Sequence, residues 1–358
     1  MEFISRNELE KIIEKISQIR LTVVGDACLD VYWWADMQKS ELSRETPYHN
    51  LPIIKEALSP GAAGNVAVNA KAIGCKTVNL VSLIGNDWRG RSLVEVLKKQ
   101  SIVTDWMVAS EDYTTPAYIK PIRCGYSGIA AEDPRIDFAP AKNASVNLQD
   151  QLLAAIDQAA ESSDLICVSD QLLNGCITGA VREKLCLLSA SGMPVFVDSR
   201  DKIQLFSGVM IKPNALEGWH AIHEKPVPDF PAKSDLTLYQ HIAEKLAAIN
   251  QAPVCLTLGP DGCIWANYED GTFIYVPALK EDAAIDIVGA GDAFLASAGA
   301  AIAAKIEHRQ ALLFASLVSN IVIHKLQTTG SATPGEILER HHQLINEKSP
   351  YMSILPDR

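Results

Sequence analysis

Two aspartates and two glycines lie within residues 286–294, DIVGAGDAF, directly before a run of small residues, LASAGAAIAA. A glycine-containing turn that leads into a helix leaves backbone N–H groups unpaired, and these groups bind an anion together with the helix dipole. Gly289, Ala290 and Gly291 fit such a turn, and their small size lets a phosphate approach the backbone. Asp292 could then accept a proton from an attacking hydroxyl, which predicts phosphoryl transfer. The simpler alternative is that Asp292 only caps the helix.

Composition limits the class of protein. The 358 residues are 48% hydrophobic and 21% charged, an ordinary globular balance with enough apolar material for a large core. The formal net charge of −11 disfavours nucleic-acid and anionic-membrane partners, because both would be repelled. Eight cysteines without a CxxC pair predict buried free thiols in a reducing compartment. With no signal peptide or membrane span in view, we expect a cytoplasmic protein that acts on small molecules.

Short apolar runs alternate with helical patterns from residue 21 onward. LTVVGD, TVNLVSLIG, DLICVSD, MPVFVDS, GVMIKPN and APVCLTLG are rich in Val, Ile or Leu, as are strands buried on both faces of a sheet. Their alternation with helices predicts one α/β domain over residues 1–358, with a mostly parallel central sheet flanked by helices. Ligands bind at the carboxyl ends of strands in such sheets, so the turns after these runs form the candidate site.

Two segments interrupt the alternation, residues 31–58 and 115–138. Both mix aromatic, β-branched, proline and glycine residues, which is typical of short antiparallel strands. We expect them to form together a small β-sheet lid over the edge of the central sheet. Residues 221–235 contain three prolines and are expected to form a surface loop.

The motifs together resemble the ribokinase-like carbohydrate kinase family. DIVGAGDAF is similar to the family signature, and GDACLD, PGAAGNVAVNAKAIG, LIGNDWRG, KPNALE, LTLGPDG and VSNIVIHKLQTTGSATP accompany it in the family's order, over about residues 20–335. GDACLDVYWWAD, VSDQ and the end pattern look most similar to bacterial heptose-7-phosphate kinases. The resemblance implies the ribokinase-like fold and ATP as donor. Because the chain ends soon after the kinase segments, we expect no fused nucleotidyltransferase domain, so that another protein would use the product.

The resemblance also assigns residues to the acceptor sugar. It implies that Asp30 binds sugar hydroxyls, with the nearby Asp26 offering a second carboxylate, although both could be solvated turn residues. It implies further that Gly61 and Asn65 flank the sugar and that Asn65 hydrogen-bonds it. A phosphorylated acceptor would need cations in so acidic a protein, although each alone could be a surface charge. The candidates are Lys120, Arg123 and Arg135 in the lid and Arg200 and Lys202 in the main sheet.

Metal ions are implied at two places. Asn214 and Glu217 match the family's Asn-x-x-Glu motif, which implies a role in holding magnesium. The same two residues could form a capping box at a helix start, and the two interpretations are compatible. Asp286, together with carbonyls of a late loop, is implied to hold potassium or another monovalent cation.

Nucleotide binding is implied by two further motifs. Thr257, Gly259 and Gly262 in LTLGPDG resemble the family's adenine-nucleotide loop, which alone would be an ordinary turn. Asn320 and Lys325 resemble the late segment that closes over the nucleotide base.

One stretch imitates a different nucleotide site. Residues 85–92, GNDWRGRS, have the spacing of a phosphate-binding loop, but Arg91 stands where lysine is required. They also match the family's strand-to-helix turn, which is the interpretation we favour. No GxGxxG motif exists, because Phe294 occupies its last glycine position, so a dinucleotide fold is disfavoured.

These features together predict an ATP-dependent sugar kinase, best matched by a heptose-7-phosphate kinase that forms a homodimer through the lid. One alternative is a kinase for an unphosphorylated sugar, such as fructose or ribose, or for a nucleoside. Another is a sugar-binding regulatory protein with weak catalysis. Ala62, Ile287 and Gln327 keep it open, because each replaces a residue that is common in the family: glycine, threonine and glycine respectively.

Overall fold

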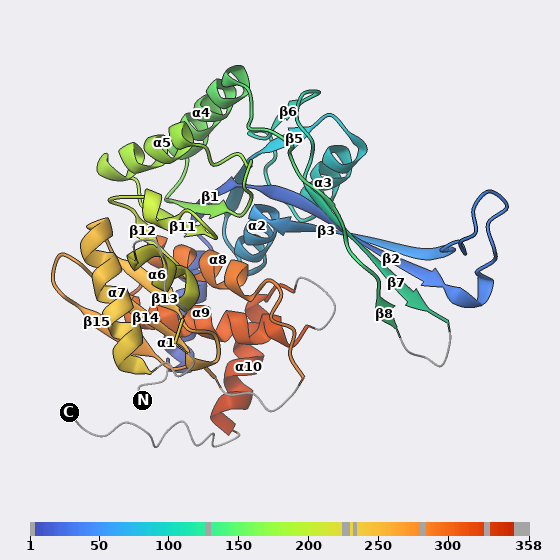
Figure 1. Cartoon of the computed structure of the whole chain (residues 1–358). Coiled ribbons are helices and arrows are strands. Elements are labelled where there is room, and N and C mark those ends of the chain that lie inside the picture. The colour runs from blue at the N-terminus through green and yellow to red at the C-terminus, as the bar shows by residue number, and fades with distance from the viewer. Residues whose placement is uncertain are drawn as a thin grey trace.

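An eight-stranded sheet runs through the body of the molecule, in the order β15-β14-β13-β12-β11-β10-β1-β4 (Figure 1). Its strands are β1 Arg20–Gly25, β4 Thr77–Val81, β10 Leu165–Asp170, β11 Val195–Ser199, β12 Met210–Ile211, β13 Val254–Thr257, β14 Cys263–Ala266 and β15 Phe273–Val276. Pairing is parallel from β4 to β13, and β14 and β15 add two antiparallel strands at one edge. The computed structural model describes residues 4–125, 130–223, 230–231, 235–279, 284–325 and 330–346.

Helices cover both faces of this sheet. Alternate strand residues enter two different cores: Leu165 and Cys167 pack among α1, α2 and α8–α10, whereas Ile166 and Val168 pack among α4–α7. The helices are α1 Arg6–Ile16, α2 Ala63–Ala72, α3 Trp88–Lys99, α4 Val146–Glu161, α5 Gly179–Ala190, α6 Ala215–Ile222, α7 Leu236–Asn250, α8 Ala290–Ala303, α9 His308–Ile323 and α10 Pro334–Asn346. The predicted mostly parallel sheet flanked by helices is thereby confirmed.

A second, five-stranded sheet extends from one side of the body and is called the lid below (Figure 1). It consists of β2 Ala27–Asp36, β3 Ile53–Ala62, β7 Ala117–Cys124, β8 Ala131–Glu132 and β9 Ile136–Phe138. The central strand β2 is antiparallel to β3 but parallel to β7, so the sheet is mixed and not purely antiparallel as expected. Strand pairing also begins earlier and ends later than the predicted segments, since β2 starts at Ala27 and β3 continues to Ala62. A short pair, β5 Leu83–Gly85 and β6 Val108–Ser110, lies apart from both sheets.

Two smaller expectations concern thiols and helices. All eight cysteines are free thiols, as predicted, but only six are buried, because Cys124 and Cys186 are partly exposed. No helix within the described ranges is long and apolar enough to cross a bilayer. The loop expected at residues 221–235 falls largely outside the described residues, after α6 ends at Ile222.

Ala62 joins the lid to the body, at the end of β3 and directly before α2. Its φ of 49° and ψ of −123° lie in a region that glycine adopts readily and that other residues seldom adopt. The amide of Ala63 donates to the main-chain oxygen of Asp26 (3.1 Å), which fixes the chain on the far side of this turn. The turn therefore keeps a backbone suited to glycine while carrying an alanine.

We expect Ala62→Gly to raise the free energy of unfolding by about 0.5–1 kcal/mol. Relief of a strain of about 1–3 kcal/mol should exceed the added entropy of the unfolded chain, about 0.4–1 kcal/mol. Urea unfolding of both proteins measures this difference. The matched control is Ala63→Gly in the first turn of α2, which should lower stability by about 0.5–1 kcal/mol; equal losses in both variants would contradict the assigned strain.

Candidate active site

Helix α8 starts at the DIVGAGDAF turn. Gly289 is its N-cap residue, with a left-handed φ of 82°, and no side chain of the described residues caps this helix. Asp292 is the third residue of the first turn, so the interpretation of Asp292 as the helix cap is wrong. The amide of Ala290 donates to the oxygen of Ile287 (3.2 Å). Within the described ranges the amides of Gly291 and Asp292 have no partner, which narrows the predicted anion site to these two groups.

Asp292 meets α2 across the packed α2–α8 contact. Its Oδ2 accepts a hydrogen bond from Asn65 Nδ2 (2.7 Å). Burial raises the pKa of Asp292 to about 7; the Asn65 bond lowers it, the charge of Asp198 raises it, and Lys212 lowers it. A carboxyl group with a pKa near neutrality suits a general base, because it is both ionised and basic enough near pH 7.

Lys212 is a buried cation behind the first turn of α8. It follows β12, is 3% exposed, and its Nζ lies 3.1 Å from Asp198 Oδ2. A Cβ placed on Gly291 would lie 3.9 Å from Lys212 Nζ. Burial favours the neutral amine, but the carboxylates of Asp198 and Glu217 outweigh it and keep the pKa of Lys212 above its usual value. Sequence reasoning missed both Lys212 and Asp198, and the only signal was a charged residue closing each of two apolar strands.

Asp30, on the lid strand β2, belongs to the same group of charged residues as Asp292. It is 6% exposed on β2, burial raises its pKa, and its charge also raises the pKa of Asp292. Lys120 Nζ, on the neighbouring strand β7, lies 3.9 Å from Asp30 Oδ1 and donates to Tyr32 Oη at 3.0 Å. A Cβ on Gly61 would lie 3.0 Å from Asp30 Oδ2, so a larger residue would crowd this carboxylate. The predicted residues Asp30, Gly61 and Lys120 thus lie together on the lid.

Asp26 does not join this group. Its Oδ2 accepts from the amides of Gln171 (2.9 Å) and Leu172 (2.8 Å), and its Oδ1 accepts from the amide of Cys176 (2.7 Å). Both oxygens are therefore engaged with the turn after β10. The expectation that Asp26 shares the sugar with Asp30 is corrected: the carboxylate holds a backbone turn, a pairing that the sequence could not reveal.

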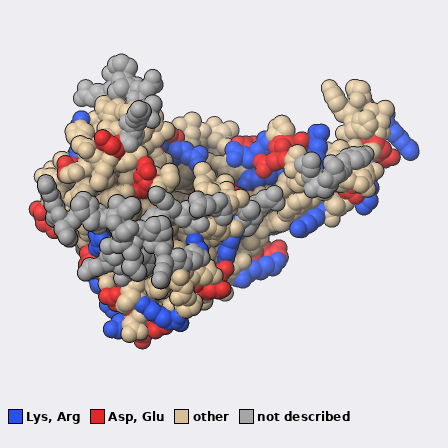
Figure 2. Space-filling model, turned by 90° about the horizontal axis from the view of Figure 1, so that it is seen from below, with Lys and Arg blue, Asp and Glu red and all other residues tan. Residues whose placement is uncertain are grey.

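The other predicted cations are mostly neutralised locally. Arg135 pairs with Asp137 (2.6 and 2.7 Å) and Arg123 pairs with Asp133 (2.8 Å). Lys202 forms an ion pair with Asp170 (3.6 Å) and donates to the carbonyls of Leu172 and Leu173 (3.1 and 3.2 Å). Arg200 is exposed, and its side chain has no hydrogen-bond or ion-pair partner among the described residues. Figure 2 shows Lys and Arg interspersed with Asp and Glu along the lid. Lys120 and Arg200 therefore remain the best candidates for an anionic group of a ligand.

Asn214 and Glu217 form the predicted capping box at the start of α6. Asn214 Oδ1 accepts from the amide of Glu217 (2.9 Å), and Glu217 Oε2 accepts from the amide of Asn214 (2.8 Å). Burial and the charge of Asp198 raise the pKa of Glu217 to about 7. A divalent cation beside Glu217 and Asp198 would relieve this repulsion, so the pair fits magnesium. No group of three or more His, Cys, Asp or Glu side chains in the described part of the chain could hold a metal unaided, so water or phosphate oxygens would complete the coordination.

Asp286 lies beside the end of α9. Its amide donates to the oxygen of Ile323 (2.8 Å), and its Oδ1 accepts from the amide of Val288 (3.0 Å). The late loop expected to supply carbonyls to a monovalent cation includes residues 326–329, with Gln327, which lie outside the described residues.

The LTLGPDG turn lies next to the Asn214 pair. Thr257 ends β13, and its amide donates to the oxygen of Pro213 (2.9 Å). Gly259 has a φ of 58° and Gly262 a φ of 103°, and a Cβ on Gly262 would lie 2.1 Å from the oxygen of Val276. The sharp turn requires glycine at position 262 for this reason.

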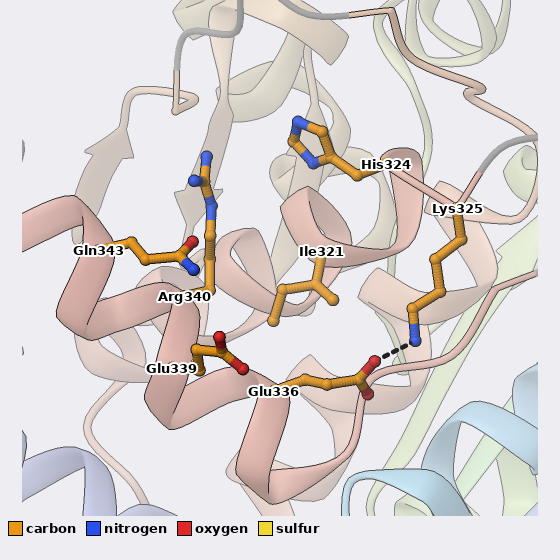
Figure 3. A pocket seen from close by; sticks show the side chains of 7 residues that line it. All are labelled: Ile321, His324, Lys325, Glu336, Glu339, Arg340 and Gln343. Atoms are coloured by element: carbon orange, nitrogen blue, oxygen red, sulfur yellow. Dashed lines mark hydrogen bonds and ion pairs between the residues drawn. The ribbon is translucent and has the colours of Figure 1, made fainter.

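Asn320 and Lys325, in and just after α9, have side chains that contact α10. Asn320 Oδ1 accepts from Arg340 Nε (2.9 Å), and Lys325 Nζ pairs with Glu336 (2.5 Å), so both side chains engage α10. Lys325 and Arg340 line a cavity of about 350 Å³ between α9 and α10, whose lining residues are labelled in Figure 3. None of the other predicted site residues lines this cavity. Helical phase turns the Asn320 side chain toward α10, and its role beside the nucleotide base stays a prediction.

A different face of α9 points at the site. Ser319 Oγ donates to the oxygen of Ala290 (3.3 Å), and Ser316 Oγ lies 4.0 Å from Cys263 Sγ on β14. Small serine side chains at this spacing gave no clear signal in the sequence.

The GNDWRGRS stretch is not a phosphate site. The side chain of Asp87 caps α3 by accepting from the amide of Gly90 (2.9 Å), and it also accepts from the amide of Thr115 (3.1 Å). A carboxylate occupies the helix end where a phosphate would have to bind, and the two would repel each other. The favoured interpretation as a structural turn agrees with this geometry.

Comparison with known proteins adds independent findings. The sequence profile described as pfkB family carbohydrate kinase matches residues 57–334. The bifunctional protein HldE of Geotalea uraniireducens is 27% identical over 336 residues, which are 93% of this chain. The chain spans 65% of the length of that relative, which is less than two thirds.

Solved structures share the fold. The ribokinase of Arabidopsis thaliana complexed with ribose and ATP has a TM-score of 0.63 at 17% identity, covering 90% of this chain and 99% of that one. Phosphofructokinase-2 of Escherichia coli has a TM-score of 0.69 at 16% identity in complex with fructose-6-phosphate, and 0.68 at 17% in complex with potassium. Both complexes cover 92% of this chain and 100% of the other. The predicted ribokinase-like fold is confirmed.

Proposed function

The chain belongs to the pfkB family of carbohydrate kinases, and on this premise we propose that it transfers the terminal phosphoryl group of ATP to a hydroxyl of heptose 7-phosphate. The observation that carries the chemistry is the start of α8. There a carboxyl group with a pKa of about 7 lies beside two open amides and in front of a buried lysine.

In the proposed reaction Asp292 accepts the proton of the attacking sugar hydroxyl. The new bond forms between that oxygen and the terminal phosphorus of ATP, while the bond to the bridging oxygen breaks and releases ADP. Asp30 and Asn65 would hold the sugar beside Asp292. The reacting hydroxyl needs to lie within hydrogen-bond reach of the base, and the contact between α2 and α8 supports such a placement.

Charge on the transferring group would be balanced from two sides. The amides of Gly291 and Asp292 point out of the helix start, and Lys212 supplies a full positive charge behind it. Magnesium bound with ATP near Glu217 would supply further charge neutralisation. Thr257, Gly259 and Gly262 would face the nucleotide, and Asp286 remains the candidate for a monovalent cation. One structural neighbour, phosphofructokinase-2, was solved in complex with potassium.

Lys120 supports a phosphorylated acceptor. Among the described residues its ammonium group donates one hydrogen bond, to the phenol of Tyr32, and lies 3.9 Å from the nearest Asp30 oxygen, so it could also bind a phosphate of the acceptor. Arg200 offers a second cation, whereas Arg135 is already held by Asp137. The likeness of the GDACLDVYWWAD segment to heptose-7-phosphate kinases points in the same direction.

Replacement of Asp292 by Asn should lower kcat about 10³-fold, because the base is lost, while ATP binding persists.

In the unmodified protein kcat/KM should fall as the pH drops through about 7, where Asp292 becomes protonated. ADP release against pH and calorimetric ATP titration measure both effects. The control is Asp170→Asn, another buried aspartate with a raised pKa of about 6. Full turnover by the Asp292 variant would refute the assigned base.

Replacement of Lys120 by Met should raise the KM for heptose 7-phosphate about 10- to 100-fold, as loss of a charged hydrogen bond predicts. The control is Arg123→Met, an exposed lid cation held by Asp133, which should change little. ADP release across a panel of sugars and sugar phosphates provides the assay. Preference for an unphosphorylated sugar or a nucleoside would remove this assignment, and ATP binding without any turnover would favour a regulatory protein.

The lid is also the proposed dimer interface. It exposes large apolar side chains near its outer end: Leu42 58%, Tyr48 74%, Leu51 39%, Ile53 43% and Ile54 54%. A second copy of the chain could cover these side chains, as the family resemblance implies. Sedimentation should show a dimer that Ile54→Glu converts to monomers, whereas Leu187→Glu, equally exposed at 59% on α5, should leave it intact. A monomeric unmodified protein would refute the interface.

A further inference from the structure

Three side chains form a hydrogen-bonded row from the interior of α2 to the start of α8. Asn69 Nδ2 donates to the main-chain oxygen of Asn65 (3.0 Å) and to Asn65 Oδ1 (3.1 Å). Asn65 Nδ2 in turn donates to Asp292 Oδ2 (2.7 Å). Asn69 is fully buried and Asn65 is 1% exposed, so water does not compete for the bonds between these two residues.

Chemistry fixes the direction of this row. A main-chain carbonyl oxygen can only accept, so Asn69 must turn its NH2 group toward Asn65 and cannot turn its oxygen there. The same NH2 group faces the Asn65 side chain, which must therefore present its oxygen to Asn69. The Asn65 NH2 group is left pointing at Asp292. The orientation of the Asn65 side-chain amide, which is ambiguous by shape alone, is thus set by Asn69, whose own orientation is fixed by the main-chain oxygen of Asn65.

A polar side chain at position 69 adds little to the stability of α2. Its Oδ1 is buried and has no hydrogen-bond partner among the described residues. A buried acceptor without a partner is unfavourable, and an apolar side chain of similar size would avoid that loss. The residue is therefore better explained by what it does to Asn65 than by its own packing.

We propose that Asn69 is a positioning residue that acts through Asn65 to favour the ionised, proton-accepting form of Asp292. With the row in its observed direction, Asp292 receives an N–H bond that only an ionised or acceptor oxygen can use. If Asn65 turned over, its oxygen would face Asp292 and would favour a protonated carboxyl group instead. The inference rests on the proposed function in so far as Asp292 is the base.

The surroundings of Asp292 make this bond important. The charged groups that face it are Asp30 from the lid strand β2, Asp198 from the end of β11, and Lys212 after β12. Of the influences that lower its pKa, the Asn65 bond comes first and Lys212 second, against burial and the two carboxylates. If the Asn65 amide were free to turn over, Asp292 would therefore lose the hydrogen bond that most favours its ionised form.

Replacement of Asn69 by Leu tests the inference. We expect the pKa that governs the acidic limb of kcat/KM to rise by about one pH unit, because a hydrogen bond to the charged form is weakened. Turnover at pH 7 should fall several-fold and recover at pH 9, with an unchanged KM for ATP at the higher pH. An unshifted profile would overturn the proposal.

Asn250→Leu is the matched control. Asn250 is 3% exposed at the end of α7, its Nδ2 donates to the oxygen of Val209 (2.7 Å), and its Oδ1 also lacks a partner in the described part of the chain. Like Asn69, Asn250 is a buried asparagine whose NH2 group donates to a main-chain oxygen, but it is not hydrogen-bonded to Asn65 or Asp292. The two variants should change stability by similar amounts, and only Asn69→Leu should shift the profile; a shift of equal size in both would show a merely structural effect and contradict the proposal.

A second measurement does not depend on turnover. Infrared titration of the Asp292 carboxyl group, with its band assigned by difference from Asp292→Asn, should show the same upward shift in Asn69→Leu, or in Asn69→Ala if the leucine variant does not fold. An unchanged titration would refute the role of Asn69. If the unmodified protein phosphorylated no sugar, the proposed function would fail, while this titration would still decide the effect of Asn69 on Asp292.

Discussion

Burial of like charges around one lysine is the constraint on which this site depends. Burial raises the pKa of Asp30, Glu217 and Asp292, and the charge of Asp198 raises it further for Glu217 and Asp292. Lys212 is the buried cation that holds Asp198 at 3.1 Å and lowers the pKa of both Glu217 and Asp292. Without it, a cluster of uncompensated carboxylates would have to take up protons or open to water. The site is thus tuned close to neutrality by a balance of burial, repulsion and one ammonium group.

The fold supplies this cluster through the parallel sheet. Asp198 ends β11 and Lys212 follows β12, and parallel neighbours place their carboxyl ends at the same edge. The start of α8 meets that edge, and α2 lies against α8. Helix α2 starts directly after Ala62, the last residue of the lid strand β3, and β3 pairs with β2, which carries Asp30. The lid carboxylate Asp30 and the body amide Asn65 are therefore held close to each other. The unfavourable backbone of Ala62 is explained by this sharp change of direction.

Sequence reasoning found the residues whose chemistry a local motif reveals. The GAGD turn, the Asn214–Glu217 box and the glycines of LTLGPDG each depend on positions a few residues apart, and each has the predicted local structure. Sequence reasoning did not find the partners of Asp26, Asn320 and Lys325, because the amides after β10 and the side chains of α10 are remote from them in the sequence. It also passed over Lys212, Asp198 and Asn69, whose importance appears only when three elements meet.

The sequence by itself determined the periodicity of strands and helices, the backbone freedom of the glycine turns, and the presence of a carboxylate at the start of a helix. These follow from short-range sterics and from the alternation of apolar residues, which act along the chain. Only the tertiary structure decided which carboxylates share one buried volume, which cations are already neutralised, and which way the Asn65 amide points. Those properties depend on distances across the fold, because desolvation and Coulomb interactions act between neighbours in space whatever their separation along the chain.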